Sequence, residues 1–340
     1  MQSLKKSKAV IVLLTTLFVM FSFGMVQAAE TFKIAPKGDK KITIGVMDLI
    51  SSIEIAGTYN KWHRRAAAKR GWKCQIFDLN VKYDKAPAIM ENLMAIGVDA
   101  IITNWVTPKY YEKQIKKAWK MGIPFIGIAN GATPDGVVAE FSLLQGVAGA
   151  ISAEYLATKL VKGDEVVTLW NPTLGISKIT HSTAKGLLEG YGLKIRQEIG
   201  WTGSGDAREF AYNSINNALV ADTEKKIKGL WIYEGGPEAA RACMENKRED
   251  IVVVTRHDTA IIVEAMRKYP VLQATSAYSF VDPLLHAGVY AMLDKIFAGE
   301  EVAMKQYHGY LPGLLTRDTL PPKGYVFDPN APDYKGRKVE

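Results

Sequence analysis

The sequence predicts an α/β protein built from two lobes, each a parallel sheet with helices on both faces. Short runs rich in Val and Ile alternate with helical stretches along most of the chain, and parallel strands need such crossover helices between them. This alternation occurs in two successive halves. The length of 340 residues also favours two hydrophobic cores over one, because single cores usually stop growing at roughly 250–300 residues.

The first half predicts four strands separated by three helices. The first strand is a β-branched run, and Gly71 is expected to end the helix that follows it. Gly97 and the segment Gly122-Ile-Pro124 are expected to separate the later helices from the strands after them. The expected strands are 41–47, 73–78, 100–103 and 125–129, and the expected helices are 59–70, 85–96 and 109–121.

The second half repeats this order and ends in a tail. Its expected strands are 165–170, 194–199, 229–233, 251–254 and 272–276, and its expected helices are 181–191, 207–220, 237–246, 260–268 and 283–298. Residues 319–340 are rich in Pro, Gly and Asp, which indicates a C-terminal tail of surface coil.

Residues 1–28 are expected to be a cleaved secretory signal peptide. Lys5, Lys6 and Lys8 form a positive start, residues 9–24 are apolar, and Val26-Gln27-Ala28 offers small or aliphatic residues for a cleavage site. A retained membrane helix is the alternative, but the apolar run of about 16 residues is shorter than the roughly 20 needed to span a bilayer. No Cys follows the cleavage point, so we expect a mature chain that is free in the periplasm or secreted.

The composition excludes several function classes. Hydrophobic residues make up 48% and charged residues 23% of the chain, which is typical of a globular protein rather than a disordered or multi-span membrane chain. Of the net charge of +8, residues 1–28 account for +3, and the remaining Lys and Arg are scattered among acids, so no nucleic-acid partner is expected. Cys74 and Cys243 form no metal-ligand or redox motif and fall in different lobes. We therefore expect two free, mostly buried thiols, no metal site and no cofactor.

Candidate ligand-binding residues come directly after the predicted strands. In open α/β sheets ligands bind beyond the carboxyl ends of the strands, so these positions are expected to face a common cleft. Carboxylates, amides and flat rings together suit a sugar or a nucleoside-like ring, which is hydrogen-bonded at its edge and stacked on its face. The residues are Asp48, Asn104, Trp105, Asn130, Trp170, Asn171, Glu234, Arg256, Asp258 and Tyr278.

Arg256 and His257 are adjacent in the sequence. Successive side chains of an extended strand point to opposite faces, so only one of the two is expected to reach the cleft. We select Arg256, whose guanidinium could neutralise a nearby carboxylate.

The order of several motifs resembles that of a known family. The motifs are Ala66-Ala-Ala-Lys-Arg-Gly-Trp72, Gly97-Val-Asp-Ala-Ile-Ile102, Gly122-Ile-Pro-Phe-Ile126, Ile251-Val-Val-Val254 before His257-Asp258-Thr259, and Ala298-Gly-Glu-Glu301. Together they resemble the type I periplasmic sugar-binding proteins of the ribose-binding group, over roughly residues 41–310. The resemblance implies two Rossmann-like lobes joined by a three-segment hinge, with the ligand trapped between them. It implies a first lobe of 41–142 plus 279–304 and a second lobe of 143–278 plus 305–318.

The resemblance also implies roles for individual residues. Asp258 falls on the family's aspartate after the Val-rich strand, and Glu234 falls where an Asn or Asp reads sugar hydroxyls. His181 falls near the family's arginine at the start of a second-lobe helix, and Tyr278 at a ligand-contacting crossover position. The loop with Trp201 and Asp206 resembles the family's loop in which an aromatic side chain packs on the ligand.

Two departures from the family pattern concern the ligand. Ala129-Asn130 replaces the Asp-Arg pair of pentose and hexose binders, and the loop 50–56 lacks their Asn-x-Phe-Phe ring stack. A simple aldopentose or aldohexose is therefore not expected. Asn130 in place of Arg, together with the carboxylate of Glu234, makes the expected cleft more acidic than a pentose site, which disfavours an anionic ligand.

The resemblance implies a periplasmic solute-binding protein that captures a small polar ligand, a sugar or sugar-like ring, for an ABC importer. It is expected to be monomeric, with the ligand and a membrane ABC permease as partners. The alternative is a periplasmic sensing partner of a membrane histidine kinase, which would use the same cleft. A secreted hydrolase is the third class, but no Gly-x-Ser-x-Gly elbow or His-Glu-x-x-His motif is present, so no enzyme is expected.

Overall fold

The computed structural model describes residues 30–52, 54–202, 206–277 and 288–323, together with the antiparallel strand pair β15 (Tyr325–Val326) and β16 (Arg337–Lys338). The chain divides into two units, residues 1–31 and residues 32–340, and both lobes lie within the second unit. The predicted signal peptide at 1–28, the candidate Tyr278 and most of the predicted 319–340 tail lie outside the described residues.

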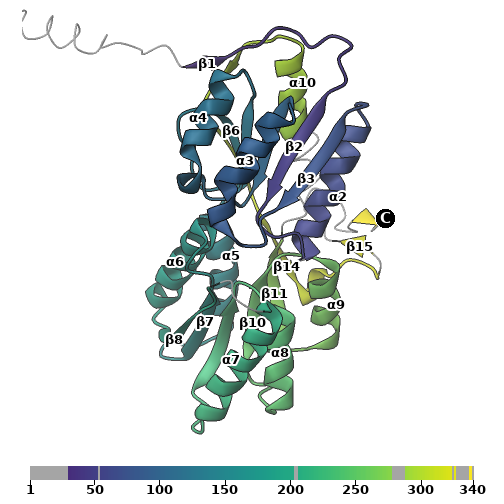
Figure 1. Ribbon diagram of the computed structural model, residues 1–340. Coiled ribbons are helices and arrows are strands. Elements are labelled where there is room, and N and C mark those ends of the chain that lie inside the picture. Colours follow the sequence, from purple (N-terminus) through teal and green to yellow (C-terminus); the bar gives the residue numbers. More distant parts are fainter. Residues whose placement is uncertain are drawn as a thin grey trace, which may run out of the picture. The chain divides into compact units, whose positions relative to one another are not determined.

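The first lobe is built on a six-stranded sheet in which every neighbouring pair is parallel (Figure 1). Its order is β13-β6-β5-β4-β2-β3. Its central strands are buried along almost their whole length, as is usual for parallel strands covered on both faces. The strands are β2 (Thr43–Asp48), β3 (Lys73–Asp78), β4 (Ala100–Asn104), β5 (Phe125–Ile128), β6 (Val137–Leu143) and β13 (Gln306–Tyr310).

Helices cover both faces of the first sheet. Ile44 and Val46 of β2 join one core with α2 (Glu54–Ala68) and α10 (Ala291–Phe297), because alternate residues of a strand face the same side. Met47 joins the opposite core with α3 (Ala86–Ala95) and α4 (Glu112–Lys120). Gly71, with a φ of +70°, follows α2 and confirms the expected end of that helix.

The second lobe repeats this plan with one antiparallel edge. Its sheet has the order β14-β11-β10-β9-β7-β8, and only β14 runs antiparallel to its neighbour. The strands are β7 (Glu165–Trp170), β8 (Lys194–Gly200), β9 (Ile227–Ile232), β10 (Val252–Arg256), β11 (Leu272–Ala277) and β14 (Gly313–Thr316).

Helices cover both faces of the second sheet in the described part of the chain. Val166 and Val254 lie in a core shared with α5 (Gln145–Thr158) and α6 (Gly175–Gly190). Val167 and Val253 lie in the core on the other face, shared with α7 (Ala207–Ala221), α8 (Gly236–Glu245) and α9 (Ala260–Lys268). Two lobes of parallel-dominated sheet with helices on both faces confirm the predicted fold class.

The order of the described elements takes the chain from one lobe to the other three times. The first passage leads from β6 into α5, the second from β11 to α10, and the third from β13 to β14. Residues 278–287 of the second passage lie outside the described part. The predicted boundary, which places all of 305–318 in the second lobe, is wrong for β13. This strand pairs in parallel with β6, whose edge would otherwise be open, and only β14 returns to the second sheet.

The sequence patterns do not single out β6 or α5, and they place the start of α6 too late. Helix α5 packs against both its own sheet and α6, so it shows no one-sided apolar stripe. A Cβ at Gly149 would lie 2.2 Å from the carbonyl oxygen of Thr180, which shows how closely α5 and α6 approach. Since α6 begins at Gly175, His181 lies in its interior and not near its first residue.

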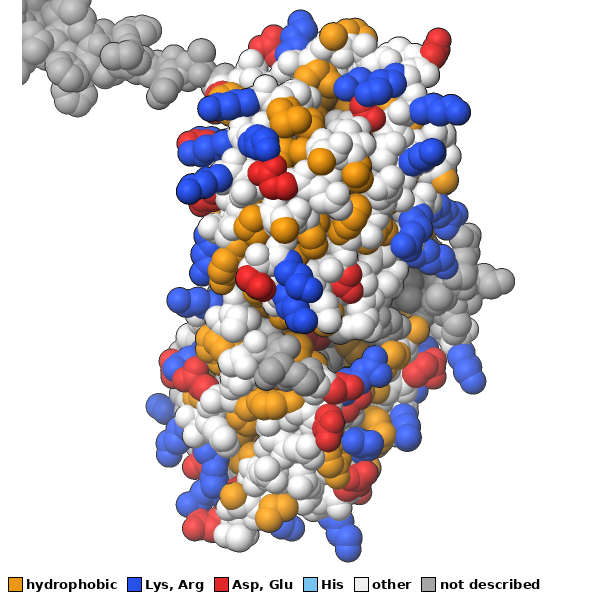
Figure 2. Space-filling model, viewed as in Figure 1, with side chains coloured by type: hydrophobic (Ala, Val, Ile, Leu, Met, Phe, Trp, Pro, Cys, Tyr) orange, Lys and Arg blue, Asp and Glu red, His pale blue; other side chains and the backbone are white. Residues whose placement is uncertain are grey.

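Charged side chains of both signs are interspersed over the visible face of the molecule (Figure 2). On and near α4, Lys117 pairs with Glu91 at 2.5 Å, and Lys116 pairs with Asp135 at 3.2 Å. All four of these side chains are exposed to solvent. Among the described residues, no helix is long and apolar enough to cross a membrane. Both cysteines are free as expected, with Cys243 buried and Cys74 half-buried.

Candidate functional site

Asp48 ends β2 at the carboxyl edge of the first sheet, but its side chain is held within the first lobe. One carboxylate oxygen, Oδ2, accepts hydrogen bonds from Asn60 Nδ2 at 2.8 Å and from Ser51 Oγ at 2.8 Å. The residue is fully buried, and this burial raises the pKa of its carboxyl to about 6. Neighbours on α2 and in the loop after β2 therefore bind Oδ2 of the group that the sequence assigns to ligand. The buried Oδ1 has no hydrogen-bond partner among the described residues.

Asn104 ends the neighbouring strand β4 and is also turned inward. Its side-chain oxygen lies 3.2 Å from His63 Nε2, and His63 Nδ1 lies 3.2 Å from the hydroxyl of Tyr290. Complete burial lowers the pKa of His63 to about 4, so the ring is neutral and Nε2 carries the proton that Asn104 accepts. Asn104 thus connects β4 to α2 and to the residue that precedes α10.

Asn130 follows β5 and lies in a buried polar cluster. Its amide Nδ2 donates to Thr103 Oγ1 at 2.6 Å, and its backbone N–H donates to Glu140 Oε1 at 2.5 Å. Glu140 comes from β6 and also accepts the backbone N–H of Gly131 at 3.2 Å. Burial raises the pKa of Glu140 to about 8, against the weaker lowering by these two backbone hydrogen bonds. The carboxyl of Glu140 therefore fixes the turn after β5.

In the second lobe, Trp170 and His181 pack on each other rather than project separately. Their rings are stacked, with centroids 4.4 Å apart and an angle of 5° between planes. The His181 Nε2 lies 3.0 Å from Thr168 Oγ1, and burial lowers the pKa of the imidazole to about 4. Burial keeps the imidazole neutral and its ring packs on Trp170, so His181 is a packing residue in this structure. It lies in the interior of α6, which starts earlier than the sequence suggests.

Asn171, Asp206 and Trp201 have local structural contacts. The side-chain oxygen of Asn171 accepts the backbone N–H of Thr173 at 2.9 Å and forms an Asx-type turn. Asp206 is the N-cap of α7 and accepts the backbone N–H of Arg208 at 2.7 Å. Trp201 is buried, and the neighbouring residues 203–205 lie outside the described part.

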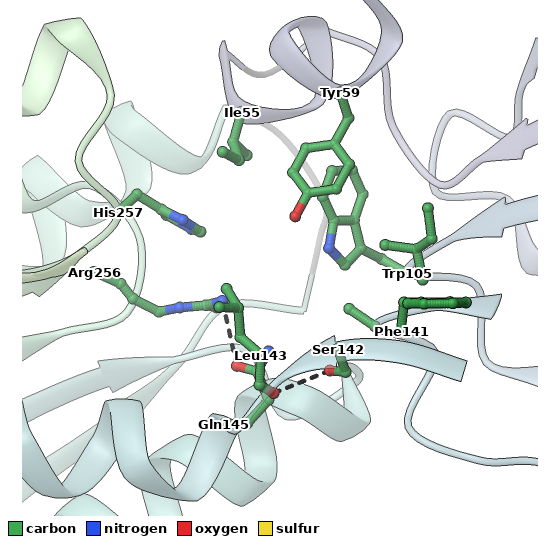
Figure 3. Close-up of a pocket in the computed structure, with 11 residues that line it drawn as sticks. Ile55, Tyr59, Trp105, Phe141, Ser142, Leu143, Gln145, Arg256 and His257 are labelled. Carbon is green, nitrogen blue, oxygen red and sulfur yellow. Dashed lines mark hydrogen bonds between the residues drawn. The ribbon is translucent and has the colours of Figure 1, made fainter. Parts of the chain in front are cut away.

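A pocket lies between the carboxyl edges of the two sheets (Figure 3). From the first lobe, Ile55, Tyr59, Trp105 and Phe141 line it, and from the second lobe Arg256 and His257 line it. Figure 3 shows the Tyr59 hydroxyl and the Trp105 indole nitrogen directed into the space that Arg256 and His257 border on the opposite side. A second pocket shares Ile55, Trp105, Arg256 and His257 and adds Glu234, so the two are parts of one cleft.

The polar side of this cleft comes from β9 and β10 of the second lobe. His257 Nε2 lies 3.3 Å from Glu234 Oε1, and the guanidinium of Arg256 lies 3.9 Å from the centre of the Tyr233 ring. Arg256 also donates to the side-chain oxygen of Gln145 at 3.5 Å, a contact between β10 and the start of α5. A carboxylate, an imidazole and a guanidinium can together bind the polar edge of a small molecule.

Arg256 and His257 both line the cleft, so the expectation that only one of them reaches it is wrong. The reason is the backbone at His257, whose φ is +72°, because a left-handed residue interrupts the strand alternation on which that expectation depends. The His257 N–H donates to the carbonyl of Ser276 at 2.9 Å, and its own carbonyl accepts the hydroxyl of Thr275, which holds the conformation.

Trp105 and Ala129 share this backbone feature. They follow β4 and β5, have φ of +60° and +52°, and line the same pocket as His257. Each is anchored to a neighbouring strand, Trp105 N–H to the carbonyl of Ile128 and Ala129 N–H to the carbonyl of Phe141, both at 2.9 Å. Left-handed non-glycine residues at three strand ends around one cleft mark it as the candidate site.

The cleft continues into a third pocket at the second lobe. Ile55, Glu234 and His257 border this pocket as well, and Arg208, Glu238 and Thr259 add polar groups. These residues lie at the starts of α7, α8 and α9.

The structure brings together only some of the predicted site residues. Trp105, Glu234 and Arg256 line the described pockets, whereas Asp48, Asn104, Asn130, Trp170, Asn171, His181 and Asp206 have the contacts given above. Trp201 and Asp258 are buried and are not part of the linings of these three pockets, so a ligand contact for either stays a prediction. The lining of the first two pockets contains one carboxylate, Glu234, and one guanidinium, Arg256. It therefore lacks the excess of acidic groups that the sequence suggests.

The cleft is also lined by residues that were not predicted from the sequence, namely Ile55, Tyr59, Phe141, Gln145 and His257. Ile55 and Tyr59 belong to α2, which starts earlier than the sequence pattern suggests, and Phe141 and Gln145 belong to β6 and α5, which the pattern does not delimit. The run Val137-Val-Ala-Glu-Phe-Ser-Leu143 is strand-like and would have indicated Phe141. Among the described residues, no group of three or more His, Cys, Asp or Glu side chains could hold a metal ion.

Comparison with known proteins places this architecture in a family. The family model for the periplasmic binding protein domain matches residues 58–294, more than half of the chain. The ribose import binding protein of Bacillus subtilis is 27% identical over 163 residues, which are 48% of this chain and 53% of that protein. The chain thus matches about half the length of this relative.

Solved structures share the fold at low sequence identity. A sugar ABC transporter protein from Yersinia enterocolitica is 18% identical with a TM-score of 0.76, covering 88% of this chain and 91% of that one. A 5-methylthioribose transporter solute-binding protein from Thermotoga lettingae, also 18% identical, has a TM-score of 0.75 and coverages of 84% and 89%. A Caulobacter myo-inositol binding protein, 17% identical, has a TM-score of 0.73 and coverages of 84% and 97%. With its two lobes and the family match over residues 58–294, the chain belongs to the periplasmic binding protein family.

Proposed function

We propose that this protein binds a small sugar-like molecule between its two lobes in the periplasm and delivers it to an ABC importer. The observation that carries the proposal is the cleft at the carboxyl edges of both sheets, lined from the first lobe by Trp105 and from the second by Arg256 and Glu234. An aromatic wall opposite a charged, hydrogen-bonding wall can bind the face and the edge of one ring.

The similar proteins support the ligand class and the importer. They include a ribose import protein, a sugar ABC transporter protein and binding proteins in complex with 5-methylthioribose and with myo-inositol. These names favour an import role over the sensory role that the same fold could serve. The proposal assigns no catalysis to the protein, and it includes export by cleavage after Ala28 and a monomeric mature chain.

Lobe closure is the proposed mechanism. The chain crosses between the lobes three times, so rotation about those passages would bring the two walls together on the ligand and bury it. Binding to the closed form alone would raise the stability of the native state, by about 2.7 kcal/mol when the free ligand is at 100 times its Kd.

A thermal-shift screen of the mature protein against sugars, polyols, nucleosides and amines tests the proposal. We expect at least one compound to raise the Tm and to compact the protein in small-angle scattering. Ile55→Trp, which fills the cleft, should abolish this effect, whereas Val161→Trp at an exposed site should not. Binding that survives Ile55→Trp, or that leaves the scattering profile unchanged, would contradict the assignment of the cleft.

A further inference from the structure

A cavity of about 400 Å³ lies in the first lobe, between α10 and the edge strand β13. Its volume is in the range of small-molecule binding sites. Its walls are one face of the helix, with residues three or four apart, and alternate residues of the strand. Phe141 is the one residue that it shares with the described linings of the ligand cleft. The helix and strand residues that line it include Gly288, Ala291, Met292, Lys295, His308 and Tyr310.

Aromatic rings form the wall of this α10–β13 cavity at the Gly288 end. Phe141 and His308 are stacked, with centroids 4.4 Å apart and an angle of 11° between planes. A Cβ at Gly288 would lie 2.8 Å from Phe141 Cε1 and 2.6 Å from the hydroxyl oxygen of Tyr310, so helix and strand are in contact here. Burial lowers the pKa of His308, and its imidazole is therefore neutral. The lining at this end consists of rings without a charged group.

The opposite end of the cavity is charged. Lys295 lies two helical turns beyond Gly288, about 10 Å along the helix axis. The N–H of Glu300 donates to the carbonyl of Lys295 at 3.0 Å, which folds the loop after α10 back beside that residue. Lys295, Glu300 and Glu301 are exposed at the rim of the cavity, and none of them forms an ion pair within the described part of the chain. One ammonium and two carboxylates are thus available to a ligand.

This arrangement favours charges of both signs on one ligand. A ligand ammonium has three N–H donors and can bind both glutamates, while a ligand carboxylate can accept from Lys295. A ligand with a single charged group would leave the opposite charge of the rim unmatched. Since the rings lie about 10 Å from the charged rim, the ligand must also carry an apolar part that extends from its charged groups. A free α-amino acid with a large apolar side chain has this form.

We propose that the α10–β13 cavity binds a free α-amino acid with an aromatic or similarly large apolar side chain. Its ammonium lies at the two glutamates, its carboxylate lies at Lys295, and its side chain extends along Met292 toward the Phe141–His308 pair. This inference goes beyond the proposed function, since it gives the protein a second ligand of a different chemical class at a different place.

L-phenylalanine is the probe, and isothermal titration calorimetry on the mature protein measures its affinity. Three comparison compounds each lack one recognised group: L-alanine lacks the ring, phenethylamine the carboxylate and 3-phenylpropanoate the ammonium. Loss of the ring should weaken binding about tenfold or more, because the ring is buried. Loss of either charged group should weaken it about threefold, because the charged end is exposed. Phenylalanine that does not bind in the millimolar range, or that binds no better than alanine, would overturn the inference.

Substitutions distinguish this cavity from the ligand cleft. Ala291→Trp fills the α10–β13 cavity and should abolish the binding of phenylalanine. Ile55→Trp, which fills the cleft, should leave that binding unchanged, as should Val161→Trp at an exposed site. Phenylalanine that is lost in Ile55→Trp and retained in Ala291→Trp would bind in the cleft, which would overturn the inference without touching the existence of a cleft ligand.

Substitutions at the exposed rim keep the test independent of folding. Glu300→Gln combined with Glu301→Gln should weaken phenylalanine binding about threefold but not the binding of 3-phenylpropanoate, which lacks the ammonium. Lys295→Gln should weaken phenylalanine binding but not that of phenethylamine, which lacks the carboxylate. Glu249→Gln, at an exposed glutamate elsewhere, controls for the loss of negative charge. An unchanged affinity for phenylalanine in both rim variants would overturn the inference.

Discussion

Replacing Glu140 with Gln should make the protein more stable at pH 8 and almost unchanged at pH 5. Glu140 is fully buried in β6, where one carboxylate oxygen accepts the backbone N–H groups of Asn130 and Gly131. The other oxygen, Oε2, has no hydrogen-bond partner among the described residues. The amide of Gln can accept the same two hydrogen bonds, but it cannot ionise.

The magnitude follows from the pKa of the carboxyl. Burial raises it from its ordinary value of 4.5 to about 8 in the folded protein. Between these pH values the unfolded chain releases this proton and the folded protein retains it, so the free energy of unfolding falls as the pH rises. The decrease is about 1.4 kcal/mol per pH unit, and the full effect above pH 8 is on the order of 5 kcal/mol. In Glu140→Gln this decrease should be absent.

Urea unfolding at pH 5, 6, 7 and 8, followed by tryptophan fluorescence, measures the effect. Asp48, whose pKa burial raises to about 6, also titrates in this range, but it is common to both proteins and cancels in the difference. Glu249→Gln, at an exposed glutamate, controls for the loss of one negative charge. Parallel pH dependences for wild type and Glu140→Gln would show that Glu140 ionises normally in the folded state and would refute the reasoning.

Three further substitutions test the site. Gly127→Ala should destabilise the protein by about 1–3 kcal/mol in urea unfolding, because a Cβ there would lie 1.9 Å from Glu140 Oε2, and a smaller effect would mean that this carboxyl moves freely. Ala129→Gly should leave stability unchanged or raise it by up to about 1 kcal/mol, because its φ of +52° disfavours a Cβ; a clear loss would show that the methyl group contributes more than the strain. Arg256→Ala should weaken binding of the best compound from the screen by about tenfold or more in calorimetry, and an unaltered Kd would remove Arg256 from the site.

Much of the fold can be predicted from the sequence because its central strands are buried on both faces. Such strands are continuous runs of β-branched and apolar residues, as at 251–254, and the turns between elements carry Gly or Pro. The predicted strands 73–78 and 165–170 and the helix 260–268 coincide with β3, β7 and α9. Helix α5 lacks such a pattern because it is covered by both the sheet and α6.

The candidate site is less predictable because its polar residues have partners that are distant in sequence. From the predicted strands, Asp48, Asn104 and Asn130 are expected at the carboxyl ends of their strands. The structure places them there. Whether such a side chain faces a ligand or its own lobe depends on Asn60, His63 and Thr103, which the sequence pattern does not connect to them. Buried polar groups bind the nearest available partner, and here that partner belongs to the same lobe.

The backbone, as much as residue type, determines which side chains line the cleft. In the left-handed region an L-residue is less stable than in its usual conformations by roughly 1–2 kcal/mol, so such residues persist only where neighbouring contacts fix them. Trp105, Ala129 and His257 meet this condition, because each N–H is bound to a carbonyl of the adjacent strand. In a regular strand the residue after Arg256 would point to the opposite face of the sheet. The left-handed backbone at His257 interrupts this alternation, so Arg256 and His257 both line the cleft. A period of two, read from the sequence, cannot reveal such a turn, since only glycine would mark it and none of the three positions is glycine.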